Sequence, residues 1–202
     1  MLCKTEMKKS RLVLVLLAVS VLILSGASAE ARQRAPDAPR EEKRPKVTAS
    51  SLEKKVHALI NREREKHGLA TLAWDDSLSG IARGHSRDMA KKNYFSHVSP
   101  EGRDFTYRYE KAGYACGVAV GQTIYQGAEN IFQNNLYDSV TTINGREYYD
   151  WNSEDKIAET TVAGWMKSPG HQKNILTPHW GKEGIGIFIS SDGKVYITQN
   201  FC

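Results

Sequence analysis

The spacing of apolar residues changes along this chain, and that change constrains the fold more than any other feature of the sequence. Near the C-terminus, two runs rich in β-branched and aromatic residues, 184–189 and 194–201, flank the turn sequence Ser191-Asp192-Gly193. Such runs, joined by a short turn that contains glycine, predict a β-hairpin. A second turn sequence, Asn144-Gly145, lies inside 140–149 and predicts a small surface hairpin.

Upstream of these strands, the apolar residues recur at the spacing of an α-helix. The pattern predicts amphipathic helices over 51–67 and 76–91, a shorter helix over 104–112 and a fourth helix over 153–167. Ser153 caps the fourth helix, an acidic first turn follows, and Pro169-Gly170 ends it. Helices that come first and strands that come later predict an α+β fold, in which helices cover an antiparallel sheet.

The first 29 residues have the composition of an export signal. Four basic residues precede a largely apolar run from Leu12 to Leu24, which the small residues of 25–29 follow. This order is typical of a signal peptide that is cleaved after Ala29. An uncleaved membrane anchor is the alternative, but the run is shorter than the roughly 20 residues that span a bilayer. We therefore expect a secreted protein, extracellular or in the cell envelope, whose mature chain has no transmembrane segment.

Residues 30–48 form a second segment that is not expected to fold. It contains three prolines and many charges but almost no large apolar residue, so we expect a disordered linker. Residues 49–202 are long enough for one domain with a single core. The net charge of +5 belongs mostly to residues 1–48, which leaves this domain close to neutral. Its composition therefore gives no basis for a nucleic-acid partner.

The cysteine count agrees with export. Cys3 would leave with the signal peptide, so that Cys116 and Cys202 remain as an even pair in an oxidising compartment. We expect a disulfide between them. The alternative, two free thiols, would fit a cytosolic location.

Two histidines stand in segments rich in turn residues, and a carboxylate lies between them in the sequence. They are His97, within Phe95-Ser96-His97-Val98-Ser99-Pro100, and His171, after Ser168-Pro169-Gly170; the carboxylate is that of Glu129, within Ala128-Glu129-Asn130. Imidazole and carboxylate groups in such segments are typical of a metal site or an acid–base centre. Together with Asn61-Arg62 and His85-Ser86-Arg87-Asp88-Met89, these segments resemble the CAP superfamily from about Leu52 to Phe201. The resemblance is to the bacterial and archaeal branch of this superfamily of cysteine-rich secretory, antigen 5 and pathogenesis-related proteins, whose domain is also called SCP.

The resemblance implies a three-layer α-β-α sandwich with a central, mainly antiparallel sheet. It also implies a cavity lined by two histidines and two acidic residues, which holds a divalent metal in some members. His97, Glu129 and His171 match three of these positions. The fourth, a glutamate in many eukaryotic members, falls here on Ser168, and Ala128 replaces the glycine that precedes Glu129. We therefore expect a cleft formed by these four residues: His97, Glu129, His171 and Ser168.

Two interpretations of His97, Glu129 and His171 stay open. Two imidazoles and one carboxylate are the protein ligands of an open zinc site, so the three residues could hold zinc or another divalent metal with water in the fourth position. The metal-bound water would then permit hydrolysis. No His-Glu-x-x-His motif is present, so three distant segments would have to converge. The alternative is a hydrogen-bonded polar network that holds loops together.

Other histidines and asparagines are assigned structural positions. His85 shares an apolar helix face and is expected in the core, whereas His57 and His67 lie among charged residues and are expected in solvent. Asn61 and Asn174 match family positions and are expected to bond to neighbouring backbone. His179 is expected in a loop, and the aromatic residues expected to line the cleft are Tyr94, Phe95 and Tyr125.

Three functions fit these features. The first, which we favour, is a secreted binding module without enzymatic activity, whose ligand is a lipid, a sterol-like molecule or another component of the cell envelope. The second is a metal-dependent, peptidase-like hydrolase that uses His97, Glu129 and His171. The third is an envelope interaction protein that engages a partner through the hairpin at Asn144-Gly145. A serine hydrolase is disfavoured because the sequence contains no Gly-x-Ser-x-Gly motif.

Overall fold

The structure is a computed structural model that describes residues 43–202. The expected signal peptide, and residues 30–42 of the expected linker, lie outside the described residues. Residues 43–48 lead without regular structure into the first helix. Within 43–202, no helix combines the length and the apolar composition needed to cross a membrane.

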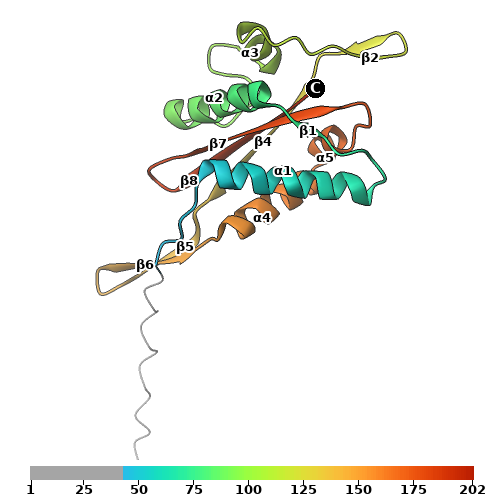
Figure 1. The fold of residues 1–202 in the computed structure, drawn as a ribbon. Coiled ribbons are helices and arrows are strands. Elements are labelled where there is room, and N and C mark those ends of the chain that lie inside the picture. Colours follow the sequence, from blue (N-terminus) through green and yellow to red (C-terminus); the bar gives the residue numbers. More distant parts are fainter. Residues whose placement is uncertain (1–42) are drawn as a thin grey trace, which may run out of the picture. The chain divides into compact units, whose positions relative to one another are not determined.

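The described chain forms a four-stranded sheet between two layers of helices (Figure 1). The strand order is β1-β7-β8-β4; β1 runs parallel to β7, and the other neighbours are antiparallel. Helices α1 and α4 lie on one side of this sheet, and α2 lies on the other. This arrangement confirms the expected α+β sandwich. The elements are α1 (Ala49–Lys66), β1 (Ala73–Trp74), α2 (Asp76–Lys92), α3 (Phe105–Lys111), β2 (Val118–Val120), β3 (Thr123–Tyr125), β4 (Ala128–Asn135), β5 (Tyr137–Ile143), β6 (Arg146–Trp151), α4 (Glu154–Lys167), α5 (Pro169–Ile175), β7 (Lys182–Ile189) and β8 (Lys194–Phe201).

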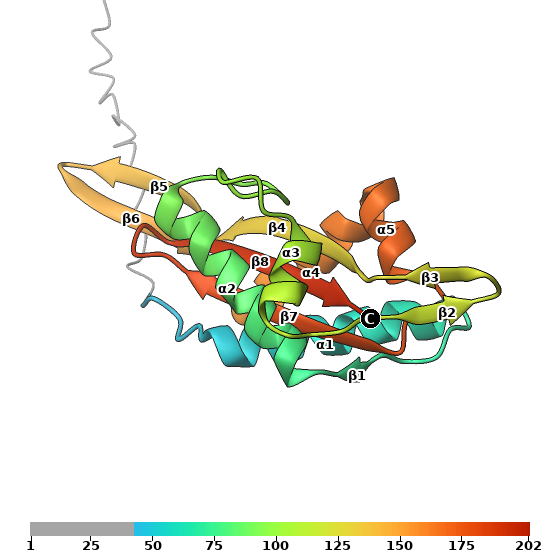
Figure 2. The same ribbon diagram turned by 90° about the horizontal axis from the view of Figure 1, so that it is seen from above.

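The four predicted helices and both predicted hairpins are present, within a few residues of the expected bounds. Ser153 caps α4 by accepting a hydrogen bond from the backbone N–H of Lys156 at 3.1 Å. Asn144 and Gly145 adopt φ values of 51° and 77°, the conformation that a tight two-residue hairpin turn requires. The resulting β5–β6 hairpin is a separate two-stranded sheet that projects from the body of the domain (Figure 2).

Two segments expected to be rich in turns are regular. Residues 169–175 form the helix α5, so His171 lies on a helix and not in a loop. Pro169 ends α4 as expected, but it also opens α5, because proline is tolerated in the first turn, where no helical hydrogen bond needs its missing N–H. Glu129 lies near the start of β4, which pairs with β8 along its whole length. The sequence around Glu129 did not indicate that this segment would pair with β8, and the strand β4 depends on that pairing.

A hydrophobic core fills the space between the sheet and the helices α1 and α4. Trp165 of α4 is fully buried, and its indole N–H donates to the backbone oxygen of Ile131 on β4 at 2.9 Å. This contact fixes α4 against the strand that carries Glu129. The largest fully buried apolar side chains of this core cluster are Trp165, Phe201, Leu52, Ile60, Ile157, Ile175, Ile185 and Ile197.

On the opposite side, α2 approaches β7 closely enough that two strand positions have to be glycine. A Cβ atom added to Gly186 would lie 1.9 Å from the backbone nitrogen of Arg83, and one added to Gly184 would lie 2.2 Å from that of Ser79. Real atoms cannot approach so closely, and the backbone of α2 has no flexible end that could move aside. The two glycines therefore set the distance between α2 and the sheet.

We expect Gly186→Ala to lower the free energy of unfolding by about 3 kcal/mol, because the added methyl group would force α2 away from the sheet. Gly181→Ala is the matched control, since a Cβ there meets nothing within 4 Å; its effect should stay within about 0.5 kcal/mol. Denaturant unfolding of both variants measures the difference. Equal stabilities would contradict the close approach of α2 and β7.

Cys116 and Cys202 form a disulfide, as expected from the cysteine count. The bond joins positions 86 residues apart and ties the end of β8 to the segment that follows α3. A crosslink over so long a stretch removes much of the freedom of the unfolded chain.

We expect Cys202→Ala to lower the free energy of unfolding by about 2 to 5 kcal/mol, the usual cost of losing a native disulfide. The oxidised wild-type domain, residues 43–202, should show no reactive thiol after denaturation. Thiol titration and denaturant unfolding measure the two quantities. Two titratable thiols in the exported wild-type protein would contradict both the pairing and the expected compartment.

Candidate functional site

The candidate site is centred on the carboxylate of Glu129, whose side chain is 1% exposed. Its Oε1 lies 2.9 Å from Nδ1 of His97, and its Oε2 accepts a hydrogen bond of 2.6 Å from Nη2 of Arg108. An ionised carboxylate only accepts hydrogen bonds, so Nδ1 of His97 carries the proton of this contact and Nε2 is left for other partners. Both oxygens of Glu129 are thus engaged by the protein itself.

Arg108 is the residue that sequence reasoning missed. It extends from α3, its side chain is 14% exposed, and it also donates to the backbone oxygens of Arg103 at 3.0 Å and of His97 at 3.1 Å. A buried carboxylate needs a paired charge, and Arg108 supplies it. Nothing in the sequence distinguished this arginine from the other basic residues, because its pairing with Glu129 arises only when α3 folds over β4.

The two expected histidines do meet. The rings of His97 and His171 lie 6.2 Å apart between centroids and are tilted by 44°. His97 comes from the loop after α2 and its side chain is 46% exposed, whereas the partly buried His171 comes from α5. Burial, and to a lesser degree the neighbouring His97, lower the pKa of His171. The ring of His171 makes no hydrogen bond within residues 43–202, so both imidazoles keep a free nitrogen.

Side-chain amides hold this site against the sheet. Nδ2 of Asn174 donates to the backbone oxygen of Glu129 at 3.2 Å and to Oδ1 of Asn130 at 2.9 Å. Nδ2 of Asn130 donates in turn to the backbone oxygen of His171 at 3.2 Å and to Oε1 of Gln199 at 3.0 Å. These bonds confirm the backbone contact expected of Asn174, and they fix α5 relative to β4.

The same network continues across the sheet to α1. Nε2 of Gln199 donates to Oε2 of Glu183 at 2.6 Å, and Oε1 of Glu183 lies 2.5 Å from Nδ1 of His57. Glu183 is fully buried, so the expectation that His57 is simply solvated was wrong. The charges near His57 in the sequence concealed a carboxylate on β7. Asn61 bonds to the backbone of Leu72 in both directions, at 2.7 and 3.0 Å, as expected.

His85 is buried beside the site, as its apolar helix face indicated. Its Nε2 lies 3.1 Å from the backbone oxygen of Ser96 and 3.9 Å from Oε1 of Glu129. Burial lowers the pKa of His85 to about 4; nearby Glu129 opposes this shift and Arg108 adds to it. His85 is therefore neutral at neutral pH and acts as a fixed polar wall behind Glu129.

The remaining candidate residues lie around this centre without bonding to it. Ser168 joins α4 to α5, and the contacts that the structure gives it are main-chain hydrogen bonds to Trp165 and Gln172. Phe95 is 47% exposed, and Tyr94 packs near Met89. The ring of Tyr125 lies 4.1 Å from that of His179 between centroids, tilted by 36°. The expected role of Ser168 in the cleft stays a prediction.

The positions of these side chains limit how they could hold the expected zinc ion. Within residues 43–202, no three side chains of His, Cys, Asp or Glu are grouped so that they could hold a metal ion. Glu129 lies behind His97, in the position of a carboxylate that orients a metal-binding histidine. Two imidazoles that share one zinc ion through bonds of ~2 Å have ring centres roughly 5 to 6 Å apart. The ring centres of His97 and His171, at 6.2 Å, lie slightly farther apart than this, and the metal site stays a prediction.

The buried neutral His85 predicts how stability depends on pH. Its pKa is about 4 in the folded protein, against 6.5 for an imidazole in water, so the unfolded chain takes up a proton first as the pH falls. The folded state should lose on the order of 3 kcal/mol between about pH 6.5 and pH 4 from this group alone. Unfolding measured over this range should show a flatter pH dependence for His85→Asn than for the wild type. Identical slopes would contradict the assignment.

Comparisons with known proteins agree with the sequence resemblance. The chain is 35% identical over 167 residues to YlbC, an uncharacterized membrane protein of Bacillus subtilis, and the match covers 82% of this chain and 38% of that protein. It is 35% identical over 154 residues to the uncharacterized protein YkwD of the same organism, with 76% and 48% covered. The chain therefore spans less than half the length of these curated relatives.

Among solved structures, an extracellular protein of Bacillus anthracis that contains an SCP domain matches with a TM-score of 0.56 and 26% sequence identity. The match covers 78% of this chain and 44% of the other. The sequence profile of the cysteine-rich secretory protein family, CAP, matches residues 57–201. This chain thus belongs to the CAP family.

Proposed function

We propose that the domain is an exported binding module of the cell envelope, whose ligand occupies the cleft beside His97 and His171. The observation that carries the proposal is that both carboxylate oxygens of Glu129 are already hydrogen-bonded within the protein. His97 holds one of its oxygens and Arg108 the other, at 2.9 and 2.6 Å. A carboxylate held in this way supports the architecture of a cleft, and it leaves the imidazole edges of His97 and His171 to meet a ligand.

The same contacts weigh against the hydrolase alternative. A general base has to reach the proton that it removes and must have a free lone pair directed at it. In Glu129, Arg108 occupies a lone pair of one carboxylate oxygen and His97 a lone pair of the other. A hydrolase at this site would have to break one of the two contacts before each turnover.

The imidazole pair is suited to a divalent cation such as zinc. Metal binding requires neutral imidazole, which the lowered pKa of His171 favours, and Glu129 fixes the ring of His97 through Nδ1. When bound, the cation would supply a positive centre that attracts an anionic or carbonyl group of a ligand. The residues of this chain would hold and orient it: His97 and His171 as ligands, and Glu129 as the partner of His97.

Export and an envelope ligand rest on the leader sequence and on what the relatives are named. One relative is described as an extracellular protein and another as a membrane protein. A lipid, a sterol-like molecule or another envelope component would meet an exported domain at this cleft. The domain, by contrast, has no net positive charge that would favour nucleic acid as its ligand.

We expect zinc to bind the purified 43–202 domain at about pH 7.5, and His97→Ala and His171→Ala each to weaken binding at least about tenfold. Glu129→Gln should weaken binding less, because Glu129 acts on the metal only through the orientation of His97. Binding should disappear toward about pH 5, where protons compete for both imidazoles. Isothermal titration calorimetry measures each affinity. His67→Ala is the matched control, because His67 is exposed at the end of α1.

If His97→Ala binds zinc as tightly as the wild type, the trio is a structural network and not a metal site. The ligand itself is sought by titrating envelope lipids and peptidoglycan fragments into the domain. The absence of saturable binding to any of them would contradict the binding module. Hydrolysis of an envelope substrate that is lost in the double variant His97→Ala, His171→Ala would favour the hydrolase instead.

A further inference from the structure

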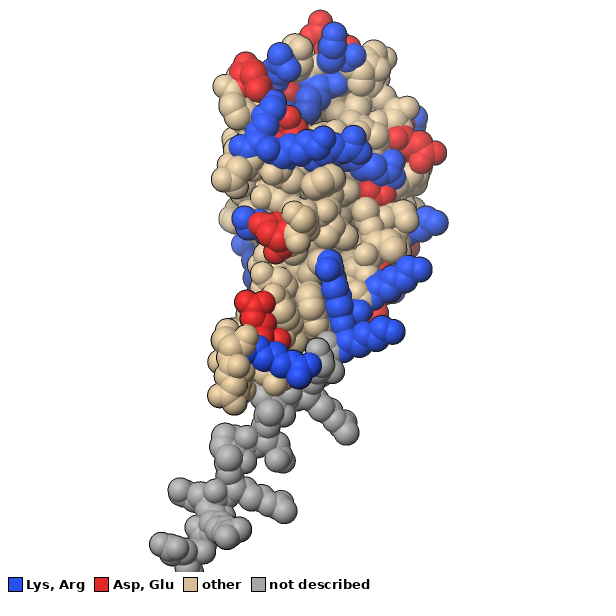
Figure 3. Space-filling view, turned by 90° about the vertical axis from the view of Figure 1, so that its left-hand side faces the viewer, with Lys and Arg blue, Asp and Glu red and all other residues tan. Residues whose placement is uncertain are grey.

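Glu183 on β7 and Arg64 on α1 are two charged residues that the structure buries completely. On the face shown in Figure 3, by contrast, charged side chains lie at the surface, where water screens their charges. Because bulk water does not reach Glu183 and Arg64, groups of the protein have to compensate these two charges. The hydrogen bonds around them lead to α5, the helix that carries His171.

One set of hydrogen bonds reaches Glu183 from α1. The main chain of Leu72 fixes the amide of Asn61, because the N–H of Leu72 donates to Oδ1 and its oxygen accepts from Nδ2. Nδ2 of Asn61 also lies 3.3 Å from Nε2 of His57, so Nε2 is the acceptor in this contact and Nδ1 carries the ring proton. Nδ1 of His57 therefore donates to Oε1 of Glu183, at 2.5 Å.

A second set of hydrogen bonds reaches Glu183 from the cleft, through three amides that we call the amide line: Asn174, Asn130 and Gln199. Nδ2 of Asn130 is the donor to the backbone oxygen of His171, because a main-chain oxygen can only accept. The same Nδ2 donates to Oε1 of Gln199, so Nε2 of Gln199 is left to donate to Oε2 of Glu183, at 2.6 Å. Asn174 begins the line by donating to Oδ1 of Asn130. Asn130, Gln199 and Glu183 are fully buried, so bulk water does not compete for these bonds.

Both sets of hydrogen bonds therefore end in a donor at Glu183. A carboxylate can satisfy both donors, because each of its two oxygens accepts. A glutamine side chain has nearly the same shape, but it accepts through its oxygen and donates through its nitrogen. In Glu183→Gln, one set of bonds would have to reverse its direction, or two donors would face each other. Main-chain groups fix the far end of each set, so a reversal leaves buried polar groups without partners.

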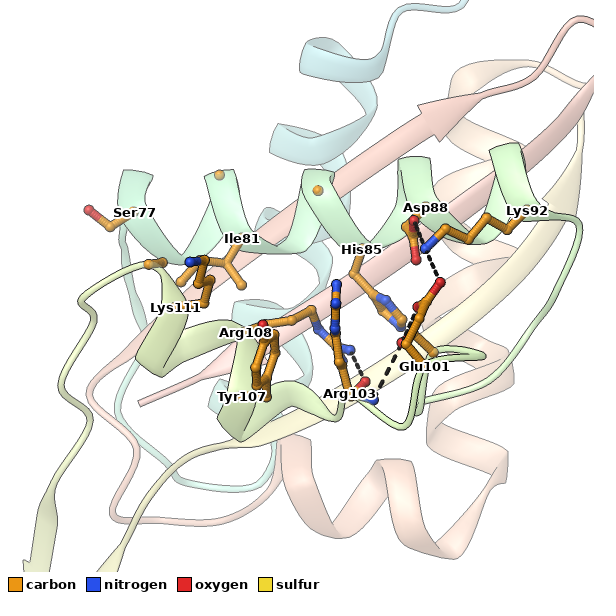
Figure 4. Close-up of a pocket in the computed structure, with 14 residues that line it drawn as sticks. Ser77, Ile81, His85, Asp88, Lys92, Glu101, Arg103, Tyr107, Arg108 and Lys111 are labelled. Atoms are coloured by element: carbon orange, nitrogen blue, oxygen red, sulfur yellow. Dashed lines mark hydrogen bonds and ion pairs between the residues drawn. The ribbon is translucent and has the colours of Figure 1, made fainter.

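The side chain of Glu129 has separate supports, on the α2 side of the sheet. Nη2 of Arg108 and Nε2 of His85 lie 2.6 and 3.9 Å from its oxygens. Both residues line the pocket between α2 and α3 (Figure 4). The helix α5, with His171, is held instead by the amide line that ends at Glu183. The two histidines of the cleft are therefore supported from different sides of the sheet.

Arg64 connects the other end of α5 to the same negative charge. Its Nη1 donates to the backbone oxygens of Ile175 and Thr177, at 2.7 and 2.9 Å, where α5 ends. Nη2 of Arg64 is buried and has no hydrogen-bond partner among residues 43–202. Burial lowers the pKa of Arg64, and the negative charge of Glu183 opposes this shift. The two buried charges therefore attract each other, and both act on α5.

We propose that Glu183 is a positioning residue of the cleft: its negative charge fixes the direction of the amide line and so holds α5, with His171, in the position that faces His97. The proposal rests on the function proposed above, because it takes the cleft as the binding site. Glu183 does not touch the ligand. It acts through Gln199 and Asn130, which carry its influence from β7 across the sheet to α5.

Glu183→Gln tests the charge at nearly unchanged shape. We expect it to shift the side-chain amide signals of Asn130 and the backbone amide signals of α5 in NMR spectra. Hydrogen exchange in α5 should become at least about tenfold faster, because the helix loses a fixed hydrogen-bond partner. Glu53→Gln is the matched control: Glu53 is equally buried, but it binds Arg83 and the backbone of Ile187 and is not part of the amide line. This control should lower stability without altering the signals of α5.

The double variant Glu183→Gln, Gln199→Glu moves the carboxylate one step along the same hydrogen bonds. The carboxylate at position 199 then accepts from Asn130 and from the amide nitrogen at position 183, whose oxygen accepts from His57. Every bond keeps its direction, so the signals of Asn130 and α5 should return to near their wild-type positions. This recovery also decides the test if Glu183→Gln alone does not fold. A double variant that is as perturbed as Glu183→Gln, or wild-type α5 signals in Glu183→Gln, would overturn the proposal.

Zinc affinity, measured by calorimetry, connects the positioning role to the proposed function. We expect Glu183→Gln to weaken zinc binding about tenfold, and the double variant to restore it, because His171 regains its position. Glu53→Gln should leave the affinity unchanged. If the wild type does not bind zinc, the metal site is wrong, and the NMR signals alone decide the positioning role. If the wild type binds zinc and Glu183→Gln binds it equally well, Glu183 does not position the cleft.

Discussion

The structure depends on carboxylates that are removed from water and must find partners inside the protein. Glu53, Glu129 and Glu183 are each at most 5% exposed, and each joins elements from different parts of the chain. Glu53 of α1 binds Arg83 of α2 and the backbone N–H of Ile187 on β7. Glu183 of β7 meets His57 of α1, and Glu129 of β4 meets Arg108 of α3. A buried charge without a partner is strongly destabilising, so these pairs fix which helix lies where.

The candidate site is a consequence of this arrangement. Because Glu129 is satisfied by Arg108 and His97, the site has a rigid, charge-balanced base and an edge made of two imidazoles. Asn130 and Asn174 hold that edge through α5. If the proposed ligand binds there, these contacts already order the site and would reduce the ordering that binding otherwise requires.

The glycines on the two sides of α2 meet opposite packing conditions. On β7, Gly184 and Gly186 are required because α2 lies too close for any side chain. On α2 itself, a Cβ added to Gly80 or Gly84 would meet nothing within 4 Å. The amino-acid composition does not distinguish between these four glycines. Only the contact at each Cβ distinguishes a position where packing requires glycine from one where it does not.

The sequence by itself determined the local elements, because helix spacing, caps and glycine turns act between neighbouring residues. It therefore predicted α1, α2, α3, α4 and both hairpins, and the small number of cysteines predicted the disulfide. It also placed His97, Glu129 and His171 in one site, through resemblance to a family. The tertiary structure alone decided that α5 is a helix, that Glu129 belongs to a strand, and that Arg108 and His57 pair with buried carboxylates. Those outcomes depend on contacts between residues far apart in the chain, whose energies appear only when the layers pack and exclude water.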